Sequence, residues 1–174
     1  SNCKMEIIQF SKDSELKIIE KLAFLTSEIN EFIIPSSIEK FEEEWSCQAI
    51  IENIKILQNN VQNIILYEDS FIIGKLDLKS DNFDNLLFAC RSIENARIPS
   101  FIKRIESYAF ENCYALKTVE FTKDSQLEQI GKFAFCLSTL ESILIPSHVS
   151  RIELSAFKLC SSLKKISFEE NSEL

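Results

Sequence analysis

The stretch that decides the fold is residues 140–160, LESILIPSHVSRIELSAFKLC. Ile143 and Ile145 lie two positions apart, as do residues on one face of a β-strand. Pro146 then ends that strand, because proline has no backbone N–H to donate to a sheet. The apolar residues after this corner indicate a second, shorter extended segment. The first part of the stretch therefore predicts two short strands joined by a corner.

The end of the same stretch carries an Ala-Phe pair and a cysteine. Phe157 and Cys160 are three residues apart, so they would share one face of a helical turn. Ala156 is small and would let a neighbouring turn approach closely. We therefore expect each unit to close with a short helical turn. A single unit could not bury its apolar residues, whereas stacked copies could, and this is the physical basis of a solenoid.

The chain repeats this pattern along its length. A shift of 47 residues places 98–127 on 145–174 with 14 of 30 residues identical and no gap. A shift of 111 places 5–42 on 116–153 with 14 of 38 residues identical. Segments of the form apolar-x-x-apolar-x-apolar begin at Met5, Ile29, Ile51, Ile93, Leu116, Leu140 and Leu163. Their spacing is 22–24 residues except for one of 42, which predicts about seven units and an insertion at about 59–85.

The repeat predicts an α/β solenoid with a short-stranded parallel sheet on one face and short helical turns on the other. We expect it to be right-handed, with strands at 7–10, 31–34, 53–56, 95–98, 117–121, 141–145 and 164–168. Within the insertion we expect a hairpin-like excursion with strands near Ile64–Tyr67, Phe71–Ile73 and Leu76–Leu78. Phenylalanines at the repeat anchors, such as Phe110 and Phe157, would form stacked ladders in the core.

The composition narrows the function classes. The 174 residues include 19 Lys and Arg against 27 Asp and Glu, which gives a formal net charge of −8. Nucleic-acid binding needs a basic surface to neutralise phosphates, so this acidic chain argues against it. The chain has two glycines and one histidine, whereas phosphate-binding loops need clustered glycines and acid–base catalysis most often uses histidine. We therefore expect no cofactor and no enzymatic activity. No apolar run is long enough to span a membrane.

The cysteines and one group of aspartates are the remaining candidates for chemistry. The six cysteines are Cys3, Cys47, Cys90, Cys113, Cys136 and Cys160. None forms Cys-x-x-Cys, and equivalent cysteines two repeats apart would lie about 10 Å from each other, too far for a disulfide. We interpret them as small buried apolar residues, with a disulfide or metal role as the alternative. Asp77, Asp81 and Asp84 lack the dense spacing and the glycine of a calcium loop, so we interpret them as a solvated loop.

The repeated residues resemble the BspA-like class of leucine-rich repeats, L-x-x-I-x-I-P-x-x-V-x-x-I-x-x-x-A-F-x-x-C. Residues 140–160 match nearly every anchor, and so do residues 98–113. The resemblance implies a curved solenoid with a parallel sheet along one face, in a family of mostly surface-displayed binding or adhesion proteins. Residues 74–84, with the Ile-Pro-Ser segment that follows, resemble the expanded surface-protein families of parasitic protists. Residues 43–47 depart from the pattern, because they lack the Ala-Phe pair.

The outward-facing strand positions form the candidate site, since solenoids commonly bind partners through an extended surface. If Val119 and Phe121 point inward, Thr118 and Glu120 point outward. We define the binding strip as the twelve residues that the same register exposes: Glu31, Ile33, Asn53, Lys55, Asn95, Arg97, Thr118, Glu120, Ser142, Leu144, Lys165 and Ser167. The alternative is an ordinary solvated sheet face.

Residues 5–174 are expected to form one repeat domain, preceded by 1–4 as a tag or linker remnant. We expect the domain to be a fragment of a longer protein, because its last repeat is cut short at Leu174. An uncapped end of this kind, with Ile166 and Phe168 as ordinary apolar anchors, would allow self-association.

Two hypotheses for function follow. The family resemblance favours a non-enzymatic, adhesin-like recognition module at the cell surface, which binds a protein or matrix macromolecule and does not itself contact the membrane. The alternative is a cytoplasmic scaffold for protein–protein interaction on the same solenoid. Six thiols without an obvious pairing scheme favour this second reading, because disulfides are rare in the cytosol.

Overall fold

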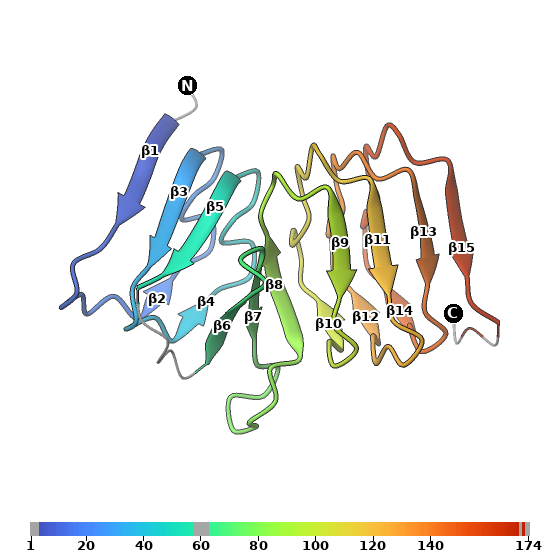
Figure 1. The fold of residues 1–174 in the computed structure, drawn as a ribbon, viewed down its shortest axis with the longest axis horizontal. Helices are drawn as coiled ribbons and strands as arrows, with labels where there is room; N and C mark the ends of the chain where they lie inside the picture. Colours follow the sequence, from blue (N-terminus) through green and yellow to red (C-terminus); the bar gives the residue numbers. More distant parts are fainter. Residues whose placement is uncertain (1–3, 58–62, 171, 173–174) are drawn as a thin grey trace.

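The computed structural model describes residues 4–57, 63–170 and 172, which form a β-solenoid of about seven turns (Figure 1). Long strands of successive turns line one face: β1 (Lys4–Gln9), β3 (Glu28–Ile34), β5 (Ile50–Ile56), β9 (Asn95–Ile98), β11 (Thr118–Phe121), β13 (Ser142–Ile145) and β15 (Lys165–Phe168). Each overlaps one of the seven predicted strands, and all pair in parallel. They form two sheets, β1-β3-β5 and β9-β11-β13-β15.

A second layer consists of shorter strands. These are β2 (Ile18–Ile19), β4 (Lys40–Phe41), β10 (Arg104–Ile105), β12 (Gln129–Ile130) and β14 (Arg151–Ile152). β2 and β4 form a sheet of their own. The other three join the insertion strands β6 (Ile64–Tyr67), β7 (Phe71–Gly74) and β8 (Asn85–Ala89) in a six-stranded sheet of order β14-β12-β10-β8-β7-β6.

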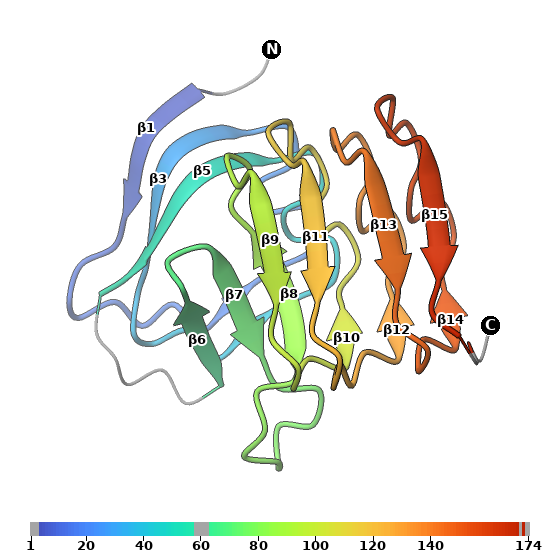
Figure 2. The ribbon, with the colours of Figure 1, turned by 45° about the vertical axis from the view of Figure 1, so that its right-hand side comes forward.

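The insertion folds as a hairpin at the edge of this second layer (Figure 2). β6 and β7 pair antiparallel, so the strands predicted at Ile64–Tyr67 and Phe71–Ile73 are confirmed. The turn between them holds Glu68 and Asp69 at φ 48° and 51°, the left-handed conformation that two adjacent hairpin-turn residues need. The predicted insertion begins at 59, and its first four residues lie outside the described part of the chain.

The third strand predicted for the insertion, at Leu76–Leu78, is wrong. These residues lie in a loop, and the strand that pairs with β7 is β8. Asp84 closes the loop, because its Oδ1 accepts a hydrogen bond from the Leu76 N–H at 3.0 Å. That bond takes up a backbone donor that a strand would have used, so the alternation of apolar residues here does not produce a ladder.

The predicted helical turns are also wrong, and no helix is found among the described residues. Each unit closes instead with consecutive tight turns. In the turn at 132–137, Phe133 and Leu137 have φ of 55° and 58°, which a right-handed helix does not allow. The same spacing of positive φ recurs at Leu22 and Thr26, Glu44 and Gln48, Tyr108 and Asn112, and Ser155 and Leu159.

The neighbouring coil explains why these turns are not helical. The Phe135 N–H donates to Ala156 O at 2.8 Å, in the next turn of the solenoid. Cys136, one residue later, donates to Phe133 O within its own turn. Alternate N–H groups therefore bond across to the next coil, so the continuous i to i−4 bonding of a helix cannot form. The Ala-Phe pair still packs against its neighbours as expected.

Two clusters of buried side chains form the core, one in each half of the molecule. In the C-terminal half, the rings of Phe110, Phe135 and Phe157 stack with centroids 4.9 and 5.3 Å apart, as the repeat anchors predicted. In the N-terminal half, the Trp45 ring packs at an angle against Phe41 and Phe88, with centroids 4.4 and 5.2 Å away. Trp45 therefore fills the position that lacks the Ala-Phe pair.

The described cysteines are all free thiols: Cys47, Cys90, Cys113, Cys136 and Cys160. Three of them are buried, and Cys113 lies in the apolar core of the C-terminal half. Cys3 lies outside the described residues. Among the residues that the structure describes, no group of His, Cys, Asp or Glu is placed to hold a metal ion. The described residues contain no helix that is long and apolar enough to cross a membrane.

Candidate partner-binding surface

The binding strip lies on the outer side of the long strands. Its residues alternate with buried ones: Val119 and Ile143 are 7% and 3% exposed, whereas Leu144 is 51% exposed. Glu31, Ile33 and Ser167 are half-buried and the other nine residues are exposed. The strand register that defines the strip is therefore the one that the structure shows. Its role in binding stays a prediction.

Side chains along the strip pair with the neighbouring strand. Thr118 Oγ1 donates to Asn95 Oδ1 at 2.9 Å, and the ammonium of Lys55 pairs with the carboxylate of Glu31. Arg97 and Glu120 occupy directly opposite positions on β9 and β11. Exposed pairs of this kind contribute little to stability. They leave a polar surface of mixed charge around Leu144, a large exposed apolar side chain.

The strip is divided between β5 and β9, which belong to different sheets. No pairing between the two strands is found among the described residues, and β5 is bonded instead by the segment that precedes β9. There the Arg91 N–H donates to Ile51 O at 3.0 Å, and Ser92 Oγ donates to Glu52 O at 3.1 Å. Four strip residues therefore lie on the N-terminal sheet and eight on the C-terminal sheet.

The repeat pattern does not predict the residues that hold this boundary together. We define the junction as the contact of turn 43–48 and residues 89–93 with turn 107–112. Arg91 is completely buried in it. The guanidinium donates to Ala49 O at 3.2 Å and to Ala109 O at 2.7 Å. It also lies 4.0 Å from the centroid of the Phe88 ring.

Glu111 supplies an acceptor at the same place. Its Oε2 accepts from the Gln48 N–H at 2.6 Å, and the residue is 3% exposed. Burial raises the pKa of the Glu111 carboxyl, while the Gln48 N–H and the Arg91 charge oppose that rise. Burial also lowers the pKa of Arg91. Desolvation of both ions is a cost, which the hydrogen bonds to the surrounding backbone offset.

The Arg91 and Glu111 side chains make hydrogen bonds that backbone groups make in the regular coils. In regular coils a turn donates directly to the next turn, as Phe110 N does to Ala134 O at 2.7 Å. The insertion interrupts this ladder, so turn 43–48 donates to the Glu111 side chain and turn 107–112 accepts from Arg91. The sequence signals that mark this place are the 42-residue spacing and the missing Ala-Phe pair, although neither identifies Arg91.

A cleft of about 460 Å³ opens beside the junction. We define the β4 cleft by its lining: Glu39, Lys40, Phe41, Glu42, Glu43, Glu44, Trp45, Asn63, Ile64, Gly74, Lys75, Leu76, Leu78, Asn85, Leu87, Glu106 and Ser107. Its volume falls in the range of about 300–1,000 Å³ that is typical of ligand-binding clefts. The repeat pattern does not predict this cleft, because the insertion brings its two walls together.

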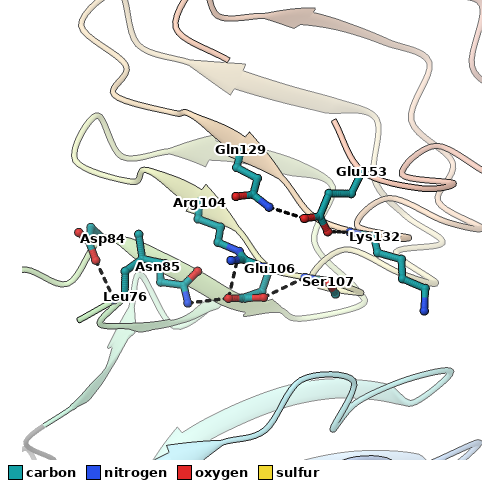
Figure 3. A network of polar contacts seen from close by, with 9 residues as sticks. All are labelled: Leu76, Asp84, Asn85, Arg104, Glu106, Ser107, Gln129, Lys132 and Glu153. Carbon is teal, nitrogen blue, oxygen red and sulfur yellow. Dashed lines mark hydrogen bonds and ion pairs between the residues drawn. The ribbon is translucent and has the colours of Figure 1, made fainter. Parts of the chain in front are cut away.

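Figure 3 shows a polar network that begins at one wall of this cleft and continues along the second layer. Glu106 is its first centre: Oε1 accepts from Asn85 Nδ2 at 2.9 Å and lies 3.2 Å from Arg104 Nε. Glu153 occupies the equivalent position two repeats later. It accepts from Gln129 Nε2 and, at 3.1 Å, from the Lys132 N–H. The network binds neighbouring coils together.

Comparison with known proteins places this geometry in a family. The profile of the BspA type leucine-rich repeat region matches residues 1–72 and 81–174 in six copies. No relative among curated proteins matches the chain.

Three solved structures share the fold. A leucine-rich repeat protein from Eubacterium ventriosum superposes with a TM-score of 0.79 at 21% identity, over 95% of this chain and 42% of that one. The pneumococcal vaccine antigen PcpA gives 0.74 at 16% identity, over 98% and 50%. A leucine-rich cell surface protein from Faecalibacterium prausnitzii gives 0.54 at 21% identity, over 88% and 52%. The chain thus spans about half the length of these proteins.

Proposed function

The chain belongs to the BspA-type leucine-rich repeat family, and on that premise we propose that it is a non-enzymatic recognition module of an adhesin-like protein at the cell surface. Its partner would be a protein or a matrix macromolecule, bound without contact between this domain and the membrane or a nucleic acid. The resemblance to protist surface proteins supports the same setting. Two of the similar structures also support it, since one is described as a cell surface protein and another as a vaccine antigen.

The observation that carries the proposal is the eight-residue group of the binding strip on the C-terminal sheet. Leu144 is 51% exposed. It lies between Glu120 and Ser167 on the two adjacent strands, and Ser142 is two residues away on its own strand. An apolar anchor surrounded by polar side chains is typical of protein-binding surfaces, in which a few residues contribute most of the free energy of binding.

Surface plasmon resonance against a panel of purified extracellular-matrix proteins would test this surface. We expect Leu144→Asp and Arg97→Glu each to weaken binding at least tenfold. Leu154→Asp is the matched control, because Leu154 is 69% exposed and lies outside the strip. Equal loss in Leu144→Asp and Leu154→Asp would argue against the strip.

The alternative function is a cytoplasmic scaffold, which the five free described thiols favour. Antibody labelling of intact and permeabilised cells separates the two locations. Labelling of intact cells supports display at the surface, whereas labelling only after permeabilisation supports the scaffold. Titration of native protein with a thiol reagent adds an independent readout, since a protein that has been through an oxidising compartment would show fewer reactive thiols.

Self-association through the C-terminal end is part of the same proposal. Among the described residues β15 pairs with β13 alone, so its other edge offers backbone groups for pairing with a further strand. Ile166 and Phe168 on this strand are 39% and 49% exposed. Sedimentation velocity should show association that increases with concentration, and a strict monomer at the highest concentration would contradict it. Replacing Phe168 with Lys should abolish the association.

A further inference from the structure

We propose that the β4 cleft binds an extended peptide segment of a partner protein by strand addition, with β4 as the template strand and with basic side chains on the peptide. This site lies on the second layer and is separate from the binding strip. The proposal rests on three observations: a strand edge with no partner among the described residues, an apolar floor, and a carboxylate without an ion pair in that part of the chain. Each is independent of the function proposed for the strip.

The first observation concerns the hydrogen bonds between second-layer strands. In regular coils two carbonyls of each short strand accept from the next coil. Lys103 O accepts from the Glu128 N–H at 2.8 Å, and Ile105 O accepts from the Gly131 N–H at 2.8 Å. The same two positions link β2 to β4, where Ile19 O accepts from the Glu42 N–H at 2.9 Å. Each short strand is therefore a template for the next.

At β4 the equivalent carbonyls belong to Glu39, just before the strand, and to Phe41 within it. Among the described residues none donates a hydrogen bond to either carbonyl, and β4 pairs only with β2. The cause is the hairpin, because β7 occupies the edge of β8 that would otherwise have faced β4. An edge strand of this kind can accept a further strand, whose main-chain hydrogen bonds supply affinity.

The floor and rim of the cleft suit the side chains of such a strand. Trp45 and Ile64 are 4% and 2% exposed and lie in the floor. Leu76 and Leu78 are 43% and 59% exposed at the rim, on the loop that projects from the insertion (Figure 2). Side chains on one face of an extended peptide, two residues apart, would enter the apolar floor, while those on the other face would remain outside.

A free carboxylate in the lining favours a basic peptide. Five glutamates line the cleft, and four of them pair with lysine or arginine side chains, so Glu43 is the one whose charge is uncompensated among the described residues. Glu43 is exposed and makes no hydrogen bond or ion pair with the described residues. Asn85 is 5% exposed in the same lining, and its Oδ1 has no hydrogen-bond partner among the described atoms. A lysine or arginine of the peptide would supply a charge to Glu43, and an N–H group would supply a donor to Asn85.

The test begins with a display library of eight-residue peptides, selected on the wild-type chain. Selected peptides are compared with the variants Glu43→Lys and Leu78→Glu, both at exposed positions that can change without loss of the fold. The matched controls are Glu120→Lys and Leu144→Glu on the binding strip. We expect peptides rich in lysine, arginine and β-branched residues, whose affinity falls at least tenfold in the two cleft variants and stays within twofold in the two controls.

Backbone N-methylation of a selected peptide then tests strand addition itself. The carbonyls of Glu39 and Phe41 face the same edge, so only alternate N–H groups of a parallel strand can reach them. Methylation of one alternate set should abolish binding, and methylation of the other set should leave it unchanged. Equal effects of the two sets would overturn strand addition.

Failure of the selection to give any peptide that depends on the cleft would overturn the site itself. Peptides that lose affinity in the strip variants instead would assign recognition to the strip alone, which also overturns this site. Because the strip variants are measured in the same series, failure of this inference is distinguishable from failure of the proposed function.

Discussion

The C-terminal coils, β9 to β15, and the junction differ in what bonds to the backbone N–H and C=O groups of their turns. In the coils the bonds run from backbone to backbone, as from Phe135 N to Ala156 O. In the junction the guanidinium of Arg91 and the carboxylate of Glu111 make the corresponding bonds. A substitution in the coils cannot remove a backbone donor, except by proline, whereas a substitution in the junction can remove several bonds at once. The comparison shows that a break in a repeat concentrates stability in a few side chains.

Arg91→Ala should have the largest effect on stability. The substitution leaves the buried carbonyl of Ala49 without a donor among the described residues. It also removes the stronger of two bonds to Ala109 O, whose other donor is the Ala89 N–H, and opens a cavity beside Phe88. We expect a loss of about 3–5 kcal/mol, toward the top of that range, because both costs add. Urea unfolding midpoints would measure it, with Arg97→Ala as the exposed control at under about 0.5 kcal/mol. Comparable losses for both arginines would contradict the role assigned to the junction.

Phe135→Ala should have the next largest effect and tests the regular coils. Its ring lies between those of Phe110 and Phe157, so its removal breaks the stack in the middle. The cost expected for deleting a buried aromatic side chain is about 3–5 kcal/mol. Thr118→Ala and Ser142→Ala, on the outer face of the same coils, should cost under about 0.5 kcal/mol. Equal losses in both groups would mean that the strand register is wrong by one residue.

Substitution of each of the two glycines by alanine tests how much room the two regions have for one added methyl group. A Cβ added at Gly131 would lie 2.6 Å from Ser107 N, a backbone atom of the adjacent coil. At Gly74 it would meet Leu87 Cδ1 at 2.8 Å, the end of a flexible side chain. We therefore expect Gly131→Ala to cost about 1–3 kcal/mol and Gly74→Ala less. Thermal unfolding of both variants decides the order, and a larger loss at Gly74 would contradict it.

Glu44→Gln should have the smallest effect, and the effect depends on pH. Lys21 and Lys132 hold the pKa of the Glu44 carboxyl below its ordinary value. A lowered carboxyl pKa stabilises the fold at pH above the ordinary value, and this stabilisation is lost as pH falls through the folded value. The wild-type advantage over Glu44→Gln, under about 1 kcal/mol, should therefore be present at pH 7 and decrease as the pH falls below the ordinary carboxyl value of 4.5. An advantage that does not change over this pH range would show that neither Lys21 nor Lys132 makes a charge interaction with Glu44.

The repeats themselves could be predicted from the sequence, because each coil buries the same anchor positions. Spacings of 22–24 residues locate the strands, and the alternation at Val119 and Phe121 gives their outer face. The helical turn could not be distinguished from consecutive turns, since Phe157 and Cys160 lie three residues apart in both. A helical turn needs each N–H to bond within its own coil, whereas consecutive turns form when alternate N–H groups bond to the next coil. The outcome therefore depends on the stacked neighbour and cannot be predicted from a single unit.

The junction and the β4 cleft could not be predicted for a different reason. Gln48 and Glu111 are 63 residues apart in the chain, and their contact depends on the path that the insertion takes between them. The loop residues Leu76 and Leu78 show the same limit: their alternation is that of a strand, but the Asp84 carboxylate binds the Leu76 N–H. In each case a side chain competes for a backbone group that the repeat pattern assigns to another backbone group.

The distance along the chain between the two sides of the junction also sets the order of folding. Neighbouring coils make contacts across about 23 residues, as in the Thr118–Asn95 pair, whereas the Gln48–Glu111 bond closes 63. By loop-closure entropy the longer loop costs about 0.9 kcal/mol more. Each half can therefore nucleate and propagate coil by coil before the two halves dock. Bonds that form after the transition state change the unfolding rate and leave the folding rate nearly unchanged, so we expect Arg91→Ala to shorten the kinetic lifetime of the native state without slowing folding.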